Sequence, residues 1–419
     1  MGVKELPTPM RWATVGALLA TVLAAPRTWA AESVQVMHWW TSGSEAVAVE
    51  KFKSALAARG VEWKDAAVGG GDNERLLLKA RVMKGDPPDA AQVTADVLTY
   101  ASNPNNLVDL TAVATSGKWD AALPDMVRRY ATMGGKSYVV VPVGINRQNV
   151  MWISADGLKK IGASAPPRTW NEFFAMADKA KAAGMQPLAV AEDTWVNFMF
   201  MQVAYSTMQP DAYRKAFEQL DAASLKGPGM VKAFEMLRKL RGYADRGAST
   251  RKWNEATQMV IRGKAFAQVM GDWAKGEFTV AGKKPNIDYF CTPLPGTENG
   301  YQFNADGFML FRRGAQKQSQ QTLAEVLMDK RTQTAFSLVK GSVPARVDSD
   351  VSQFDECSKQ SYSYYLAASK QGTLTAAPQM TQTPARIAAW RDTVLSFWYD
   401  DTMAPQQAAD RMAAVAKPN

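Results

Sequence analysis

The chain has 419 residues, more than one hydrophobic core usually supports, so we expect two lobes or domains. The formal charge of +9 is spread along the chain without a long basic block, which argues against nucleic-acid binding. A single histidine excludes a histidine metal cluster, and we expect neither a metal ion nor a cofactor.

Residues 1–30 have the features of a secretory signal peptide. Lys4 and Arg11 precede an apolar run over residues 12–25, and residues 28–30 offer a cleavage site with small residues. The run is too short to span a bilayer, no later segment is long enough, and the run contains no cysteine for lipid attachment. We therefore expect the mature protein to be free in the periplasm, without a lipid anchor.

After this leader the chain alternates between strand-like and helix-like segments, which predicts an α/β fold with mostly parallel sheets. Capping boxes at Ser42–Glu45 and Thr169–Glu172 predict helix starts. The predicted elements, in chain order, are a strand at 34–40, a helix at 46–59, a strand at 61–68, a helix at 72–85, strands at 90–93 and 137–144, a helix to 181, a strand at 188–191, largely helical sequence at 195–261, strands at 265–270, 287–291 and 308–311, and helices in most of the remainder.

The extended segment at residues 145–153 continues directly from the predicted strand at 137–144. Together they are long enough to cross from one lobe to another. The chain shows no internal repeat and no low-complexity linker, so we expect lobes that exchange segments rather than domains in series.

Cys291 and Cys357 are the only cysteines. An even pair in an exported chain predicts one structural disulfide. The loop that it would close spans 66 residues, and the chain-entropy estimate of the stabilisation is about 4 kcal/mol.

The raw material for catalysis is sparse, and we predict no catalytic residue. His38 lies within a predicted strand, where a core or hinge role is the more common one. The three glycines at 69–71 resemble a phosphate loop, but no Gly-Lys-Ser/Thr follows them, and a tight turn explains them equally well. Carboxylate pairs for glycoside hydrolysis are defined by their separation in space, so the sequence neither excludes nor indicates them.

Seven short motifs carry a family resemblance, and together they cover nearly the whole mature chain. They are HWWTSGSE from His38, GDPPDAAQ from Gly85, RKWNEA from Arg251, VMGDWAKGEF from Val269, CTPLPGT from Cys291, FNADGF from Phe303 and KGSVPAR from Lys340. The sequence resembles the periplasmic sugar-binding proteins of ABC importers, a branch of extracellular solute-binding protein family 1. Within that family it looks most similar to the glucose- and mannose-binding branch.

The resemblance implies a two-lobed periplasmic-binding-protein fold of the maltose-binding-protein type (class II), with the ligand in a cleft between the lobes. It places residues 31–142 and 295–342 in the N-terminal lobe, and residues 143–294 and 343–419 in the C-terminal lobe. The implied function is a non-catalytic receptor that captures a monosaccharide or small oligosaccharide and delivers it to an ABC permease. We expect a monomer with no nucleic-acid partner.

Aromatic residues near strand ends suit this function, because a planar ring can cover the C–H face of a pyranose. We predict that Trp39 and Trp40 form a wall from one lobe, since adjacent tryptophans after a strand are hard to bury together. Trp273 and Trp253 are predicted to approach from the other lobe.

Polar ligand contacts are assigned by motif. Glu45 lies in the first turn after the tryptophan pair, where the alternative role is helix capping alone. Gln92 ends a predicted strand, and Asp306 and Lys340 resemble the charged hydroxyl ligands of the family.

Two positions depart from the glucose-binding branch. Thr94 stands where that branch has lysine or histidine, and Pro378 stands where it has histidine. Losing donors that ligand hydroxyls require costs binding energy, so the resemblance does not carry glucose over to this chain. We keep Thr94 in the predicted site and leave open a similar sugar, a differently substituted sugar or a small oligosaccharide.

Two other functions stay open at this point. In a secreted carbohydrate-active hydrolase, Glu45, Asp272 and Asp306 would act as acid and base on a glycosidic bond. A sensory module that reports sugar without transport would have the same binding site, and the sequence does not separate it from a transport receptor.

Overall fold

The computed structural model describes residues 1–5, 32–94, 97–100, 104–245, 247–314 and 317–416. The chain forms two units, Met1–Ala31 and Glu32–Asn419, and the second unit carries every helix and strand described below. Residues 1–5 are exposed and have no regular structure. The rest of the predicted signal peptide lies outside the described residues.

A seven-stranded sheet organises the first lobe, with the strand order β12-β6-β11-β3-β1-β2 and β13 paired to β11. Its strands are β1 (Glu32–His38), β2 (Val61–Ala67), β3 (Ala90–Val93), β6 (Val140–Arg147), β11 (Tyr301–Leu310), β12 (Val343–Pro344) and β13 (Leu374–Ala376). A small hairpin joins β4 (Thr132–Met133) to β5 (Ser137–Tyr138).

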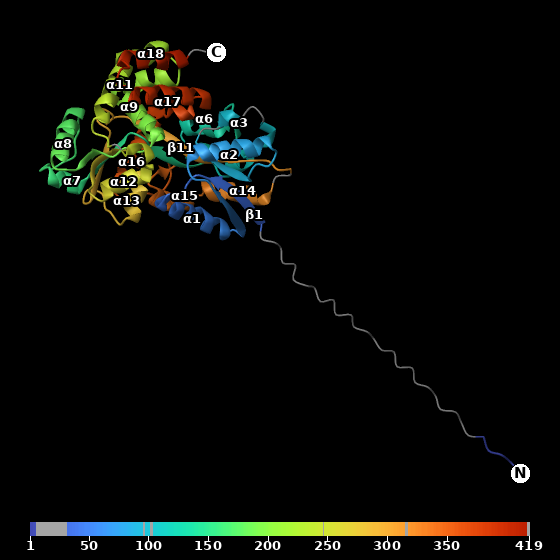
Figure 1. Ribbon diagram of the computed structural model, residues 1–419. Helices are drawn as coiled ribbons and strands as arrows, with labels where there is room; N and C mark the ends of the chain where they lie inside the picture. Colours follow the sequence, from blue (N-terminus) through green and yellow to red (C-terminus); the bar gives the residue numbers. More distant parts are fainter. Residues whose placement is uncertain (6–31, 95–96, 101–103, 246, 315–316, 417–419) are drawn as a thin grey trace. The chain divides into compact units, whose positions relative to one another are not determined.

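Helices cover both faces of this sheet. They are α1 (Gly43–Ala57), α2 (Gly71–Met83), α3 (Val97–Tyr100), α4 (Thr111–Ser116), α5 (Trp119–Ala122), α6 (Asp125–Ala131), α14 (Gln318–Met328), α15 (Lys330–Lys340) and α16 (Glu356–Gln371), with 3-10 turns at Pro104–Asn106 and Pro378–Met380. Figure 1 shows α1, α14 and α15 on one side of the sheet and α2, α3 and α6 on the other. This is the arrangement of an α/β lobe with a sheet buried between two helical layers.

The second lobe contains a four-stranded sheet in the order β10-β7-β9-β8. Its strands are β7 (Val150–Ser154), β8 (Gln186–Leu188), β9 (Ala265–Val269) and β10 (Tyr289–Pro293). Its helices are α7 (Ala155–Lys160), α8 (Trp170–Ala182), α9 (Asp193–Phe217), α10 (Ala222–Leu225), α11 (Pro228–Arg241), α12 (Trp253–Ile261), α13 (Ala274–Val280), α17 (Pro384–Tyr399) and α18 (Pro405–Val415), with a 3-10 turn at Ala248–Thr250. Figure 1 shows α9, α11, α17 and α18 gathered at one end of this lobe.

The chain passes between the sheets where β6 ends at Arg147 and β7 begins at Val150, which agrees with the predicted crossing segment. It returns from β10 into β11. Because β6 leaves the first lobe and β11 re-enters it, the two strands run antiparallel. The prediction of mostly parallel sheets was therefore wrong. Both sheets are mixed, and among the described strands the parallel pairs β1–β2, β1–β3, β11–β13 and β8–β9 are fewer than the antiparallel ones.

Separate hydrophobic cores support the division into two lobes. The first core joins residues 34–145 to residues 301–345 and continues through Tyr362 and Tyr365 to Met380. The cores of the second lobe contain residues between 150 and 294 and, from Trp390 onward, the C-terminal helices. The predicted boundary at residue 343 thus differs from the packing, because α16 and β13 dock mainly on the first sheet.

Local signals in the sequence were mostly reliable. The capping box at Ser42 and Glu45 is present at the start of α1. At the start of α8, Thr169 caps the backbone N–H of Glu172, but the Glu172 carboxylate accepts from the backbone N–H of Arg168 instead of from the cap residue. Strand β11 extends from residue 301, well before the predicted start at 308, because its polar first half is buried by contact with the rest of the protein.

The predicted disulfide between Cys291 and Cys357 is confirmed, with the two Cα atoms 6.1 Å apart. Cys291 lies on β10, and Cys357 lies in the first turn of α16. The bond therefore ties the second sheet to a helix whose other end packs in the first core.

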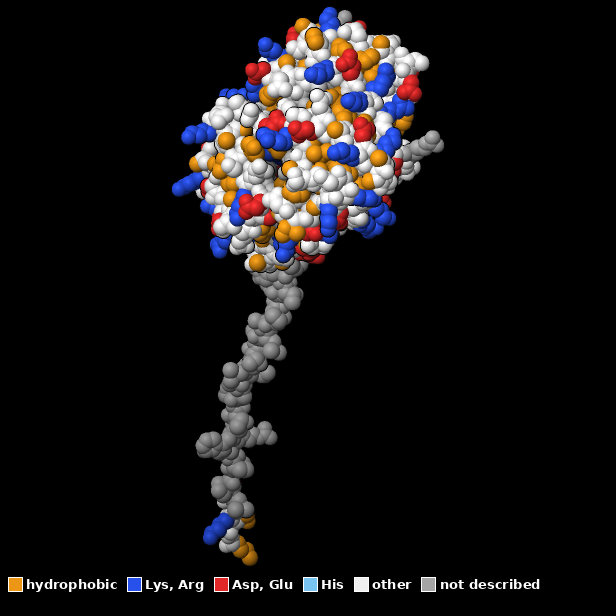
Figure 2. All heavy atoms as spheres, turned by 90° about the vertical axis from the view of Figure 1, so that its left-hand side faces the viewer, with side chains coloured by type: hydrophobic (Ala, Val, Ile, Leu, Met, Phe, Trp, Pro, Cys, Tyr) orange, Lys and Arg blue, Asp and Glu red, His pale blue; other side chains and the backbone are white. Residues whose placement is uncertain are grey.

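On the face shown in Figure 2, lysines and arginines are scattered among acidic side chains.

Candidate ligand-binding site

A buried polar group forms where β3, β6 and β11 lie side by side in the first sheet. Gln92 at the end of β3 accepts a hydrogen bond from the backbone N–H of Trp39 at 3.1 Å and donates to Asp306 Oδ1 at 3.4 Å. Asn146 on β6 donates to Asp306 Oδ2 at 2.8 Å. A β-bulge between Asp306 and Gly307 shifts the register between β11 and β6 at this point.

Gly307 is required by the close packing at this bulge. A Cβ atom there would lie 2.5 Å from Val140 Cγ1 and 2.9 Å from the carbonyl oxygen of Val141, which no side chain can accommodate without a shift. The glycine thus lets β6 and β11 approach closely enough for Asn146 to reach Asp306.

Asp306 is 4% exposed, and burial raises the pKa of its carboxyl above the ordinary value. Lys340 and the hydrogen bonds from Asn146 and Gln92 oppose this shift, because they stabilise the charged form. The carboxylate therefore depends on its neighbours for its charge.

Lys340 and Glu45 form a buried ion pair next to this group. Lys340 Nζ lies 3.3 Å from Glu45 Oε1, and the two side chains are 3% and 8% exposed. Glu45 also caps α1 by accepting from the backbone N–H of Ser42 at 3.3 Å. Its two proposed roles, helix capping and a place among the polar site residues, are thus combined in one side chain.

Aromatic rings from the second lobe face this charged group. The Trp273 ring packs against Phe198 and Trp195, at centroid distances of 5.4 and 5.9 Å, and Trp195 continues to Trp253 at 6.2 Å. Lys340 Nζ lies 6.0 Å from the Trp273 ring centroid. The structure therefore brings Trp273 to the lysine and places Trp253 one ring farther away.

The two adjacent tryptophans have different environments. Trp39 is half-buried, and the guanidinium of Arg75 covers its ring at 5.0 Å. Trp40 is 2% exposed and packs in the first core against Phe308 and Phe336, at 5.6 and 4.9 Å. The expectation that both rings form a ligand wall is corrected for Trp40, because the chain turns after β1 and directs this ring beneath the sheet surface.

Thr94 lies outside the charged group. Its hydroxyl accepts a hydrogen bond from Arg75 Nη2 at 3.2 Å, so Arg75 connects it to the ring of Trp39. Thr94, Tyr130 and Asp306 line a hollow of about 260 Å³. Pro378 is buried at the start of a 3-10 turn and offers no side-chain donor.

Three buried polar atoms around this site have no hydrogen-bond partner among the described residues: Asn146 Oδ1, Asp272 Oδ1 and Trp273 Nε1. An unsatisfied buried donor or acceptor costs about 1–3 kcal/mol, so clustered examples indicate a place where a polar ligand or water completes the bonding. The site offers one N–H donor and two oxygen acceptors in addition to its charged groups.

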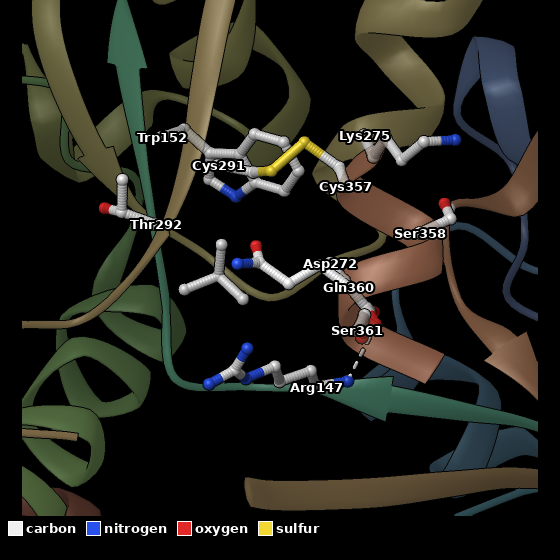
Figure 3. A pocket seen from close by; sticks show the side chains of 12 residues that line it. Arg147, Trp152, Asp272, Lys275, Cys291, Thr292, Cys357, Ser358, Gln360 and Ser361 are labelled. Carbon is white, nitrogen blue, oxygen red and sulfur yellow. Dashed lines mark hydrogen bonds between the residues drawn. A yellow bond between two sulfur atoms is a disulfide. The ribbon is translucent and has the colours of Figure 1, made fainter. Parts of the chain in front are cut away.

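A second hollow, of about 330 Å³, lies at the crossing between the lobes (Figure 3). Arg147 and Asp272 line it together with the disulfide. The backbone N–H of Arg147 donates to Asp272 Oδ2 at 2.9 Å, and burial raises the pKa of Asp272 to about 8. Lys275 in the same lining is paired with Asp355 at 3.1 Å. Trp152 lines this hollow, but the rings of Trp273, Trp195 and Phe198 do not. We therefore place the ligand site at the charged group and regard this hollow as part of the hinge, with Asp272 shared by both.

The lobes touch directly beside the site. Glu277 on α13 accepts hydrogen bonds from the hydroxyl and the backbone N–H of Ser44, at 2.7 and 3.2 Å. Gly276 permits this approach, because a Cβ there would lie 2.8 Å from both Ser44 Oγ and the carbonyl oxygen of Val339. An acidic side chain from one lobe thus holds the first turn of a helix in the other, where the helix dipole favours negative charge.

Sequence reasoning missed Asn146, Trp195 and Phe198. Asn146 could have been found as a polar residue in the crossing segment, where a polar side chain in a buried strand needs a reason. The two aromatic residues lie in α9, a segment predicted only as helix, and no local signal distinguishes them.

His38 is buried, and its Nε2 is 2.7 Å from Asp65 Oδ1, which agrees with the predicted core role.

In the part of the chain that the structure describes, no group of three or more His, Cys, Asp or Glu side chains is arranged to hold a metal ion. Among the same residues, no helix has the length and apolar character needed to cross a membrane.

The sequence model for bacterial extracellular solute-binding proteins matches residues 41–333 of this chain. The chain belongs to this family. Its relatives include a probable sugar-binding periplasmic protein of Mesorhizobium japonicum, which is 40% identical over 96% of this chain and 98% of the relative. Another protein of the same description, from Rhizobium meliloti, is 39% identical over 87% and 88%.

Solved structures of other solute receptors share the fold of this family member. The bacterial solute receptor AcbH, described as exclusively preferring β-D-galactopyranose, matches with a TM-score of 0.77 and 16% identity, over 91% of this chain and 97% of the receptor. Maltose-bound MalE3 of T. maritima matches with a TM-score of 0.75 and 17% identity, over 92% and 99%. At these identities the likeness concerns the fold, and it confirms the two-lobed, maltose-binding-protein-like architecture expected from the sequence.

Proposed function

We propose that this solute-binding protein is a periplasmic receptor that binds a saccharide between its lobes and delivers it to the permease of an ABC importer. The observation that carries the proposal is the pairing of a buried charged group, Lys340 with Glu45 and Asp306, with the ring of Trp273 from the opposite lobe. A pyranose offers a C–H face to a ring and hydroxyls to charged groups, so it fits both halves. The names of the relatives support the same ligand class.

Lobe contact suits a receptor that closes over its ligand. The Ser44–Glu277 hydrogen bonds and the ion pair between Asp72 and Arg391, at 3.0 Å, join the lobes beside the site. A ligand of pyranose size would enter when these contacts open and be enclosed when they form. Hinge closure of this kind shifts a population toward the closed state only if the ligand contacts that state more fully.

Within this proposal the residues have distinct tasks. Lys340 and Trp273 Nε1 donate to sugar oxygens, Glu45, Asp306 and Asn146 Oδ1 accept from hydroxyls, and the Trp273 ring covers an apolar face. Trp39 and Gln92 support the group from the first lobe, Trp253 backs the aromatic wall, and Thr94 lies at the margin, where it could contact a substituent or a second ring.

Calorimetry on the mature chain against a panel of mono- and disaccharides, sugar acids and polyols tests the proposal. We expect at least one saccharide to bind, and binding to fall at least tenfold in Trp273→Leu, because the ring contact and a donor are both lost. Trp170→Leu is the matched control, since Trp170 lies on α8 and donates to Ser206, outside the site. Absence of binding across the panel, after denaturation and mass spectrometry have excluded a copurified sugar, would reject the proposal.

The comparisons give the hydrolase alternative no support, because the matching family and the relatives are described as solute-binding and sugar-binding proteins. We expect no sugar release from a panel of glycosides. Release that disappears in Asp306→Asn would support an enzyme instead.

A further inference from the structure

Helix α2 exposes four apolar side chains. Leu76, Leu77 and Met83 are 70%, 44% and 79% exposed, and Ala80 is exposed between them. Positions 76, 80 and 83 share one face of the helix, while Leu78 is fully buried on the opposite face. We call the four exposed residues the outer stripe. Single exposed apolar residues are common, but a contiguous stripe at helical spacing marks an interaction surface.

Basic side chains border this outer stripe. Lys79 and Lys84 are exposed, and neither forms an ion pair within the described segments of the chain. A partner that receives the stripe would therefore carry acidic side chains around an apolar contact, because complementary charge favours encounter and fixes orientation.

The first turns of the same helix contact both Trp39 of the predicted site and the second lobe. Asp72 pairs with Arg391 on α17 of the second lobe, and Arg75 lies over the ring of Trp39. Gly71 lies beside that ring as well, since a Cβ atom there would be 3.5 Å from Trp39 Cδ2. One end of α2 thus joins the lobes beside the ligand site, and the remainder displays the outer stripe.

We propose that the outer stripe of α2 docks on the periplasmic face of the ABC permease, in an apolar contact bordered by acidic permease side chains. This rests on the proposed function as a transport receptor. Four side chains of one helix cannot cover the roughly 800 Å² that each partner contributes to a stable dimer, so the surface suits a transient partner better than a second copy of this chain.

The first test separates docking from ligand binding. In the native bacterium the gene is replaced by a Leu76→Gln, Met83→Gln double variant, and uptake of radiolabelled D-glucose, D-mannose, D-galactose, D-xylose and maltose is measured. We expect uptake of the transported sugar to fall about tenfold, because two apolar contacts are lost, while the purified variant binds that sugar as the parent does. The matched control is Ile287→Gln, which removes a residue that is 68% exposed on the second lobe. Equal uptake by the double variant and the control would overturn the proposal.

The second test identifies the partner. A photoreactive benzoylphenylalanine is placed at position 80 in living cells, and the crosslinked products are identified by mass spectrometry. A crosslink to a membrane subunit of an ABC importer is expected. A crosslink only to a second copy of this chain, or to no importer subunit, would overturn the proposal. If the permease is crosslinked but no saccharide binds the purified protein, the docking surface stands and the saccharide assignment fails.

Discussion

Replacing Lys340 with methionine tests the charged group most directly, because methionine keeps most of the volume and removes only the cation. At an effective dielectric constant of about 20, opposite charges separated by the 3.3 Å between Lys340 Nζ and Glu45 Oε1 attract by about 5 kcal/mol. Both side chains are almost fully buried, so solvent screens little of this attraction. Breaking a buried pair leaves an uncompensated charge, and we expect Lys340→Met to lower the free energy of unfolding by about 3–5 kcal/mol.

The loss should depend on pH. Burial already raises the pKa of Asp306, and Lys340 opposes that shift, so the variant raises this pKa further. A carboxyl whose folded pKa lies above its unfolded value stabilises the protein at low pH and loses this contribution as pH rises through the folded pKa. The deficit of Lys340→Met relative to the parent should therefore be smallest near pH 4 and grow toward pH 8.

Urea unfolding followed by tryptophan fluorescence measures both effects. Lys84→Met is the matched control, because Lys84 is exposed, and we expect it to change stability by less than about 0.5 kcal/mol. The double variant Glu45→Gln, Lys340→Met completes a cycle in which we expect a coupling energy of about 1–3 kcal/mol. A loss below about 1 kcal/mol in Lys340→Met, or strictly additive effects in the cycle, would refute the reasoning that the pair is buried and coupled.

Three further predictions concern the core, the hinge and the disulfide. Trp40→Ala should lower the free energy of unfolding by about 3–5 kcal/mol, because it leaves a cavity in the core. Trp39→Ala should lower it far less and mainly weaken saccharide binding. Urea unfolding and calorimetry compare the two variants, and equal losses of stability would contradict the assigned environments. Asp272→Asn should remove a pH dependence of the unfolding free energy. Because burial raises the pKa of Asp272 to about 8, the parent loses stability relative to the variant as pH rises through about 8. Parallel curves of stability against pH from 5 to 9 would disprove this. Replacing Cys291 and Cys357 together with alanine should lower the unfolding free energy by about 2–5 kcal/mol, measured by urea unfolding of the variant against the oxidised parent, with the reduced parent expected to match the variant.

Much of the fold could be predicted from local patterns. Capping at Ser42, the strand at residues 265–270 and the crossing near residue 147 each follow from chemistry within a few residues of the chain. The mixed sheet order could not be predicted this way, because the direction of β11 depends on where the chain returns after an excursion of about 150 residues. The polar first half of β11 was likewise not predicted as strand, since its burial comes from distant segments of the chain.

The residues of the candidate site were also only partly predictable from the sequence. Family motifs pointed to Glu45, Gln92, Trp273, Asp306 and Lys340, and the structure brings these residues together. The sequence could not predict that Trp40 lies in the core, because the space available beneath the sheet decides which way a ring points after the end of a strand.

The sequence by itself determined the cap at Ser42, the apolar strands and the disulfide partners, since each depends on residue type and spacing. Only the tertiary structure decided that Lys340 meets Glu45 and Trp273, that Asn146 supports Asp306, and that α2 turns its outer stripe toward solvent. Those facts rest on contacts between segments far apart in the chain, and such contacts are selected by the packing of both lobes together rather than by any one segment.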